Sequence, residues 1–237
     1  MDEETRANLE AISVATVSMQ LLKRGLRNVS MAGPKPLNAP AKPILCEAYT
    51  LRYVPMREDL STPDVLGDPD FQPRVAIEQA PEGAVLVIDG RGRADIAVAG
   101  DILVERLRVR GVAGLVSDGA LRDLAECLQA GFPLYAAGAA APASVAGHSA
   151  GDLQTPVSCG GVAVIPGDVI KADGDGVIVI PKALASEVGR DGVEQERYER
   201  FAKLRVAQGR AVPGIYPPND AARAEYADWL EAGEPED

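Results

Sequence analysis

The residues with the clearest chemistry are an arginine and an aspartate that stand side by side, Arg122 and Asp123. They follow an apolar run over residues 112–117 and an Asp-Gly pair, which is the pattern of a buried strand ending in a turn. A carboxylate is a hard oxygen ligand that suits Mg²⁺ or Mn²⁺, and a guanidinium suits an oxyanion beside such a metal. A structural role stays open, because residues 123–126 also match a helix capping box.

A second chemical feature is the Gly-Asp pair at residues 100–101. Apolar residues at helical spacing follow it and predict a helix over 101–107, with Gly111 placed to end it. If Asp101 caps this helix, the other first-turn amides, including that of Ile102, stay free and suit an anion such as a substrate carboxylate. The alternative is an ordinary cap with water on the spare amides, since aspartate is a common cap residue.

The two features lie at the starts of two helices. A further helix is predicted over 124–130, with Gly131 and Pro133 as stop signals. The starts at Asp101 and Asp123 therefore flank one strand-and-turn unit. Their convergence in space is left open at this point.

The order of these motifs resembles the aldolase and regulator-of-ribonuclease-activity-A family. Gly-Asp is followed by a helical segment, by G-x-x-G-L-V-x-D-G over residues 111–119, and then by x-x-R-D. The similarity continues in PVSCGGVAVIPGDVIKADGDGVIVIP, residues 156–181, and in EAYTLRYVP, residues 47–55. It covers most of residues 10–205, and the motifs are specific because they occur in this order.

The resemblance implies a fold and an activity. The fold is a layered α/β sandwich of the swivelling β/β/α type, assembled as trimers or hexamers with sites between subunits. The activity is that of a metal-dependent aldolase, which releases pyruvate from a 4-hydroxy-2-oxo acid and decarboxylates oxaloacetate as a side reaction. The 4-hydroxy-4-methyl-2-oxoglutarate aldolases are members of this family.

The resemblance also assigns roles to residues. Asp123 would hold Mg²⁺ or Mn²⁺ with mostly water as the other ligands, and Arg122 would stabilise the charge that develops on the C2 oxygen. Gly100 and the amides of Ile102 and Leu103 would hold the substrate carboxylate. Asp101 would orient a water that relays the proton from the C4 hydroxyl.

The same family brings a glutamate from a neighbouring subunit towards the site. Three glutamates of a charged helix predicted over 192–209 are the candidates: Glu194, Glu196 and Glu199. The alternative is a solvated face that pairs with itself, because Glu196–Arg200 and Glu199–Lys203 stand at i,i+4 in the favourable order.

Two other functions compete with the aldolase. Some family members are non-catalytic regulators that bind another protein, but the presence of both Arg122 and Asp123 favours the enzyme. A nucleotide-binding oxidoreductase rests only on Gly90 and Gly92, which resemble the start of a dinucleotide-binding motif. Asp95 stands where that motif needs its third glycine, so we reject this interpretation. The two glycines are better explained as room for a loop near the start of the 101–107 helix.

Composition limits the function further. The 237 residues are 46% apolar and 25% charged, the profile of a soluble globular protein. The net charge of −11 disfavours nucleic acid, and no apolar run reaches the ~18 residues of a membrane span. The acidic first residues do not resemble a signal peptide. Three widely spaced cysteines fit neither a disulfide framework nor a zinc site, so we expect a reducing cytoplasm.

We expect one domain over residues 1–237, with its core over about 10–205. Further predictions are a helix over 3–24, strands over 44–54 and 84–89, a loop over 57–73, and a hairpin turn over 173–176. The only histidine, His148, is interpreted as a solvated loop residue, as are Arg91 and Arg93. The aromatic tail over 206–237 is predicted to pack on a neighbouring subunit.

Overall fold

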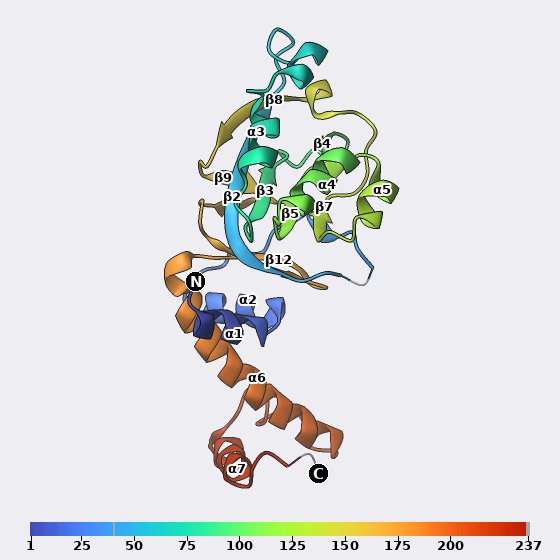
Figure 1. Cartoon of the computed structure of the whole chain (residues 1–237). Helices are drawn as coiled ribbons and strands as arrows, with labels where there is room; N and C mark the ends of the chain where they lie inside the picture. The colour runs from blue at the N-terminus through green and yellow to red at the C-terminus, as the bar shows by residue number, and fades with distance from the viewer. Residues whose placement is uncertain (40, 236–237) are drawn as a thin grey trace. The chain divides into compact units, whose positions relative to one another are not determined.

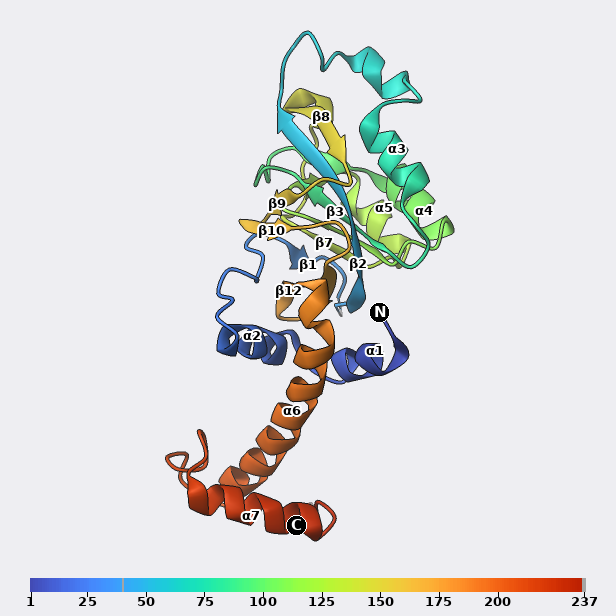
Figure 2. The ribbon, with the colours of Figure 1, turned by 90° about the vertical axis from the view of Figure 1, so that its left-hand side faces the viewer.

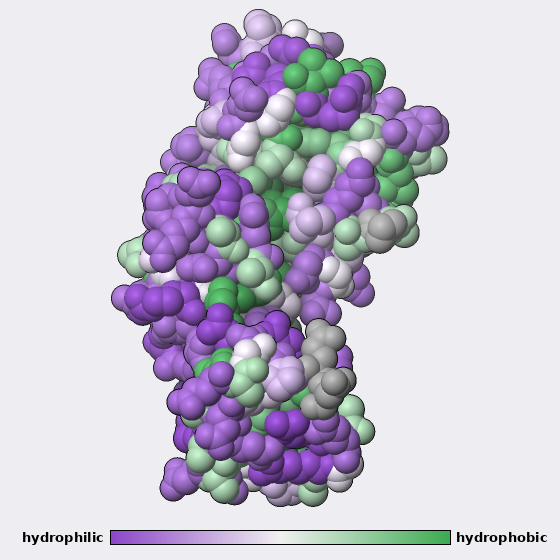
Figure 3. All heavy atoms as spheres, turned by 60° about the horizontal axis from the view of Figure 1, so that its bottom comes forward, coloured by the Kyte–Doolittle hydropathy of each residue, from purple (hydrophilic) through white to green (hydrophobic). Residues whose placement is uncertain are grey.

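A computed structural model describes residues 1–39 and 41–235. The chain divides into two compact units, Ser13–Ala185 and Met1–Ile12 with Ser186–Asp237, and each is described by itself. None of the described helices is long and apolar enough to cross a membrane. Hydrophilic side chains prevail on the face shown in Figure 3.

The larger unit is built on a mixed eight-stranded sheet that curls towards a barrel. Its main strand order is β1 (Lys35–Pro36), β7 (Leu134–Ala136), β5 (Gly114–Ser117), β3 (Val85–Asp89), β2 (Ile44–Pro55), β11 (Val169–Asp173) and β12 (Gly176–Ile180), and β8 (His148–Leu153) pairs with β2. The strands β7, β5, β3 and β2 are parallel. The other pairings in this sheet are antiparallel.

Both faces of the central strands are buried, so their side chains alternate between two cores. In β3, Leu86 and Ile88 belong to one core, whereas Val85 and Val87 belong to the other. A strand covered on both faces has an unbroken apolar sequence. This explains why the run over residues 84–89 predicts a strand correctly.

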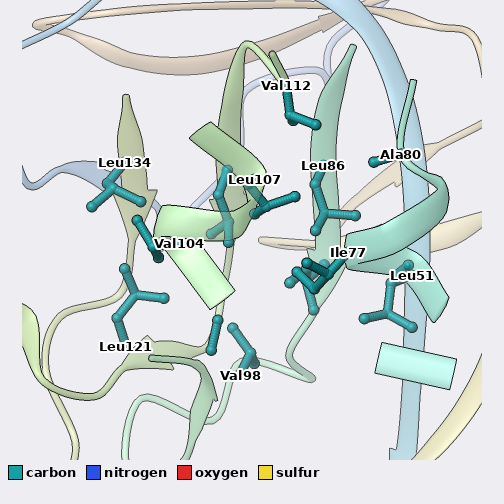
Figure 4. Packing of buried hydrophobic residues seen from close by; sticks show 14 of the residues in the cluster. Leu51, Ile77, Ala80, Leu86, Val98, Val104, Leu107, Val112, Leu121 and Leu134 are labelled. Carbon is teal, nitrogen blue, oxygen red and sulfur yellow. The ribbon is translucent and has the colours of Figure 1, made fainter. Parts of the chain in front are cut away.

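Helices cover one core and a β-hairpin covers the other. The helices are α3 (Gln72–Gln79), α4 (Asp101–Val109) and α5 (Leu124–Gln129), and the hairpin is β9 (Val157–Cys159) with β10 (Val162–Val164). Figures 1 and 2 show these elements on opposite sides of β3. In Figure 4, Ile77 of α3 and Leu107 of α4 pack towards Leu86 of the sheet. The predicted layered α/β fold is therefore confirmed.

A second, two-stranded sheet lies in the same unit and pairs β4 (Ala97–Ala99) with β6 (Ala120–Leu121) in parallel. Each strand leads directly towards one of the two chemical features, Gly100-Asp101 and Arg122-Asp123. The short helices η1 (Pro63–Gly67) and η2 (Ser144–Ala146) complete this part of the unit.

The predicted helix over 3–24 is two helices, α1 (Glu3–Glu10) and α2 (Val14–Lys23). Ser13 separates them because its backbone is extended and its hydroxyl accepts a hydrogen bond from the amide of Thr16, which caps α2. The spacing of apolar residues continues from α1 into α2, so this spacing alone does not reveal the break. The turn over 173–176 is confirmed, since Asp173 and Gly176 face each other at the end of the β11–β12 hairpin.

The smaller unit contains α1, α6 (Ala185–Ala207) and α7 (Asp220–Glu231). Phe201 of α6 and Trp229 of α7 are buried together, with Tyr198 and Tyr226 packed around them. The aromatic residues of the tail thus pack on α6 of their own chain. Packing of the tail on a neighbouring subunit, like the single-domain organisation, stays a prediction.

Candidate functional site

The β4–β6 pairing brings the two predicted features together. Parallel strands present their carboxyl ends at the same edge, and here those ends deliver Gly100 and Arg122. The amide of Arg122 donates to the carbonyl of Ala99 at 3.0 Å. The convergence left open by the sequence is therefore present in the structure.

The start of α4 differs from the prediction by one residue. Gly100, not Asp101, is the cap: its backbone is extended and its carbonyl accepts from the amide of Val104 at 3.0 Å. Asp101 is the first helical residue and makes no capping hydrogen bond, so its predicted role as the N-cap was wrong. Within the described residues, the amides of Ile102 and Leu103 have no acceptor, which leaves them available to an anion.

Gly100 is a glycine because a side chain would not fit. A Cβ atom there would lie 2.8 Å from Cγ of Arg122 and 3.2 Å from Oδ2 of Asp123. The start of α4 can approach these two residues this closely because Gly100 has no side chain.

Asp123 occupies the N-cap position of α5, and its carbonyl accepts from the amide of Cys127 at 3.0 Å, but its side chain does not cap the helix. Its backbone is left-handed, with φ 51° and ψ 44°, and its carboxylate makes no capping hydrogen bond. Oδ2 instead accepts from Nε of Arg122 at 2.9 Å. The capping-box interpretation was wrong, because an aspartate in this conformation directs its carboxylate away from the helix amides. A left-handed non-glycine residue costs conformational energy and is characteristic of functional sites.

The backbone carbonyl between Arg122 and Asp123 accepts a hydrogen bond from a buried thiol. The thiol of buried Cys127 donates to the carbonyl of Arg122 at 3.3 Å. Burial, followed by the charges of Asp101 and Asp123, raises the pKa of Cys127 to about 11, so the thiol keeps its proton. Both carboxylates therefore lie near this sulfur.

All the predicted residues of this region line one pocket of about 460 Å³: Gly100, Asp101, Ile102, Leu103, Arg122 and Asp123. The side chains of Arg122 and Asp123 are 46% and 43% exposed, so the pair is accessible to a ligand. The pocket is also lined by residues that the sequence did not single out, among them Tyr53, Arg74 and Ser144. Tyr53 lies in the stretch 47–55 that carries part of the family resemblance, whereas the stretches around Arg74 and Ser144 contain no recognisable motif.

Tyr53, which also lines the pocket, is almost fully buried. Ser144 lies close enough to act on its hydroxyl, yet no group in the described part of the chain meets hydrogen-bonding geometry with it. Burial dominates and raises the pKa of Tyr53 to about 12. The ring stacks on His148, with 4.8 Å between centroids.

The residues present fit Mg²⁺ or Mn²⁺ better than zinc. Among the described residues, no three His, Cys, Asp or Glu side chains gather at a metal-binding distance, as a zinc site would need. Mg²⁺ instead keeps several waters and binds through one or two carboxylates. Asp123 provides such a carboxylate, because it is accessible and bonds no helix amide.

The three candidate glutamates lie on α6 in the smaller unit and have partners there. Glu194 accepts from the hydroxyl of Tyr226 at 2.9 Å, and Glu199 accepts from Nε2 of Gln195 at 2.9 Å. Glu196 also interacts with a neighbour. Their approach to a site in another subunit stays a prediction.

The Gly90–Gly92 loop packs on the turn after β5, and its approach to the start of α4 stays a prediction. A Cβ atom on Gly90 would lie 2.5 Å from the amide of Gly119, which makes Gly90 a contact to the turn after β5. The amides of Gly90 and Gly92 donate to Asp118 at 2.7 and 3.0 Å. They are therefore occupied and do not face a phosphate.

Asp118 is the centre of a buried network that the sequence did not indicate. Its carboxylate also accepts from the amide of Gly160 at 3.0 Å, so it joins three loops. Asp89 accepts from the amides of Arg91 and Ser158. Burial, together with the charge of Asp118, raises the pKa of Asp89.

His148 belongs to the buried region, and its interpretation as a solvated loop residue was wrong. It is 1% exposed because it lies in β8 against Tyr53. Burial and the charges of Arg91 and Arg93 lower the pKa of His148 to about 4. Arg91 and Arg93 are both half-buried. Arg91 donates to the carbonyl of Gly147, and Arg93 pairs with Asp95.

The fold and the site together define an α/β protein with a pocket at the carboxyl ends of two short parallel strands. The RraA-like family, described as Aldolase/RraA, matches residues 14–179. The chain belongs to this family, as its motifs led us to expect.

Three relatives give the range of similarity. A Halalkalibacterium halodurans protein, provisionally named 4-hydroxy-4-methyl-2-oxoglutarate aldolase, is 41% identical over 48% of this chain and 53% of its own length. Protein DlpA of Legionella pneumophila is 30% identical over 83% of this chain and 30% of its own length. The solved structure of Streptomyces coelicolor RraAS2, an unusual member of the RNase ES inhibitor RraA family, has a TM-score of 0.76 and 31% identity over 86% of this chain and 97% of that chain.

The chain thus spans about half the length of the H. halodurans protein and less than a third of DlpA. The relatives' names associate the family both with aldolases and with inhibitors of RNA processing. The site of this chain is the basis for choosing between them.

Proposed function

We propose that the protein is a divalent-metal-dependent aldolase that cleaves a 4-hydroxy-2-oxo acid to pyruvate and a carbonyl compound. The observation that carries the proposal is the pocket in which the free amides of α4 meet Arg122 and Asp123. An anion site, a hard carboxylate ligand and a guanidinium are the groups this reaction needs. Assembly as a trimer or hexamer, with a neighbour's glutamate at the site, is part of the same proposal.

Each residue has a task in this reaction. The amides of Ile102 and Leu103 bind the substrate carboxylate, and Asp123 holds Mg²⁺ or Mn²⁺. The metal, when bound, supplies a Lewis acid beside the keto oxygen. Arg122 stabilises the negative charge that develops on the C2 oxygen as the C3–C4 bond breaks. Asp101, whose carboxylate has no partner in the described part of the chain, orients the water that takes the proton from the C4 hydroxyl.

The same charge develops when oxaloacetate loses carbon dioxide, so oxaloacetate decarboxylation is the proposed side activity. It needs Arg122 and the α4 amides but no proton transfer from a C4 hydroxyl. Asp101 should therefore be important for aldol cleavage and much less important for decarboxylation.

The experiment is a screen for pyruvate release from 4-hydroxy-2-oxo acids. Turnover should require Mg²⁺ or Mn²⁺, stop with EDTA, and return when excess metal is added. Full turnover in EDTA would exclude the metal role of Asp123. No pyruvate from any 4-hydroxy-2-oxo acid, together with capture of a ribonuclease by the purified protein, would favour the second candidate, a non-catalytic regulator of the kind that the RraAS2 similarity suggests.

A further inference from the structure

The pocket holds a second arginine that the proposed mechanism does not use. Arg74 belongs to the first turn of α3 and lines the same pocket as Arg122. Its side chain is exposed and, within residues 1–39 and 41–235, has no hydrogen-bond or ion-pair partner. Arg91 and Arg93, the two arginines of the loop after β3, are engaged elsewhere.

The side chain of Arg74 has no ion-pair partner in the described part of the chain, because the acid expected to pair with it, Glu78, pairs with other arginines. Glu78 stands at i+4 on α3, where an ion pair with Arg74 would be expected. The carboxylate of Glu78 instead accepts from Nη2 of Arg106 at 2.7 Å and lies 3.7 Å from Nη1 of Arg110, both at or near the end of α4. The ion pair between α3 and α4 therefore leaves the guanidinium of Arg74 without a counter-charge.

The pocket as a whole is suited to more than one negative charge. Arg122 and Asp123 neutralise each other at 2.9 Å, and Asp101 and Arg74 are the other two charged residues that line it. A divalent cation at Asp123 would make the lining positive by two charges. The amino-terminal turns of α3 and α4 both line it and add their positive dipole ends.

The lining also contains apolar groups. Leu66, Phe71 and Val98 lie in the pocket wall and would pack against a short carbon chain. The volume of about 460 Å³ is in the range of small-molecule sites.

We propose that Arg74 is the specificity-determining residue of this pocket and binds an anionic group at the end of the substrate remote from the 2-oxo acid. The proposal rests on the proposed function for the orientation of the substrate. It predicts that the enzyme prefers substrates whose remote end is a carboxylate over those whose remote end is a methyl group.

Binding gives a test that needs no turnover. 2-Oxoglutarate and 2-oxopentanoate have the same carbon chain and differ only in a terminal carboxylate or methyl group. With Mg²⁺ present, calorimetry should show about 10- to 100-fold tighter binding of 2-oxoglutarate, the range of a charge-assisted hydrogen bond. Arg74→Gln should bring the ratio close to one, and Arg74→Lys should keep part of it because the charge remains.

Arg108→Gln is the matched control. It removes the same charge from an exposed position of α4 that does not line the pocket. The preference should be unchanged in this variant. If Arg108→Gln and Arg74→Gln reduced the preference for 2-oxoglutarate equally, the proposal would be overturned, because the effect would then be one of net charge.

Turnover separates this proposal from the proposed function. The kcat/KM for pyruvate release should be higher for 4-hydroxy-2-oxoglutarate than for 4-hydroxy-2-oxopentanoate. Arg74→Gln should remove this preference by raising the KM for 4-hydroxy-2-oxoglutarate. If neither acid is cleaved but the binding preference depends on Arg74, the aldolase proposal fails and the Arg74 proposal stands. If both acids are cleaved and Arg74→Gln changes neither the ratio of the two binding affinities nor the ratio of the two kcat/KM values, Arg74 is a solvated arginine and the Arg74 proposal fails.

Discussion

Two pairs of aspartates that stand at or just after strand ends in the larger unit contrast with each other. Asp89 and Asp118, at the ends of β3 and β5, are buried and bind backbone amides of neighbouring loops. Asp101 and Asp123, after β4 and β6, are solvent-accessible and make no such bonds. The same residue type in the same kind of place thus stabilises the fold in one sheet and is available for chemistry in the other.

The contrast follows from what surrounds each strand end. The large sheet is covered on both faces, so a carboxylate at its edge must satisfy its charge inside the protein. The small sheet opens into the pocket, where solvent or a ligand can meet the carboxylate. Burial of the strand end, rather than sequence position, separates the structural from the functional aspartates.

The largest expected effect tests the accessible pair. Asp123→Asn removes the negative charge that would hold the metal, while asparagine tolerates the left-handed backbone about as well as aspartate. We expect pyruvate release to fall on the order of 100- to 1,000-fold or more, with the melting temperature unchanged. Steady-state kinetics and thermal unfolding check the two halves of this prediction.

Near-normal turnover in Asp123→Asn would show that the reaction does not need the carboxylate of Asp123, and the contrast between structural and functional aspartates would fail. A large loss of stability would instead place Asp123 with the structural aspartates. Only lost activity in a stably folded variant agrees with the structure described above.

The next effect tests the buried pair. In Asp118→Asn, the side-chain NH₂ group must face at least one of the amides of Gly90, Gly92 and Gly160, all of which are donors. A buried donor without an acceptor costs about 1–3 kcal/mol, so the free energy of unfolding in urea should fall by about that amount. Pyruvate release per folded molecule should change far less than in Asp123→Asn. An unchanged free energy of unfolding would contradict the structural role of Asp118.

The last effect concerns the pH dependence of the buried region. His148 has a pKa of about 4 in the folded protein against about 6.5 in an unfolded chain. Between these values the unfolded chain binds the proton and the folded one does not, so stability falls as the pH is lowered from 6.5 to 4. The loss of stability over this window is at most about 3 kcal/mol, and stability is no longer reduced above pH 6.5.

His148→Phe isolates this contribution, because phenylalanine can still stack on Tyr53 and does not titrate. The groups that act on His148 are Arg91, Arg93 and Asp95, and all three remain in the variant. The difference in unfolding free energy between wild type and variant should change with pH over that window. Parallel curves would show that His148 is not held neutral by the fold.

Much of the site could be predicted from residue type and spacing. Arg122 and Asp123 were singled out because a guanidinium and a carboxylate follow a strand, and Gly100-Asp101 because they start a helix. The resemblance to the family supplied their roles. The strands were predictable because burial on two faces makes their sequences continuously apolar.

The conformation of Asp123 could not be predicted in the same way. Its local sequence satisfies a capping box, and what overrides that pattern is the pairing of β6 with β4 and the contact of Cys127 with the carbonyl of Arg122. His148 was misjudged for a similar reason: its glycine and serine neighbours are typical of a loop, yet its burial depends on Tyr53. Arg74 lacks any signal, since only the Glu78–Arg106 pair leaves it free.

The pairing of β2 has a consequence for the protein during its synthesis. β2 joins β3 along one edge, whereas its other edge receives β8 and β11, and β11 follows about 110 residues later. At about 5–20 residues per second, the ribosome needs on the order of 5–20 s to make that intervening stretch. For this time a long, apolar strand edge on the nascent chain has no partner, and such edges are where chains associate with one another. The interval between β2 and β11 is therefore a period in which this edge is open to association with other chains.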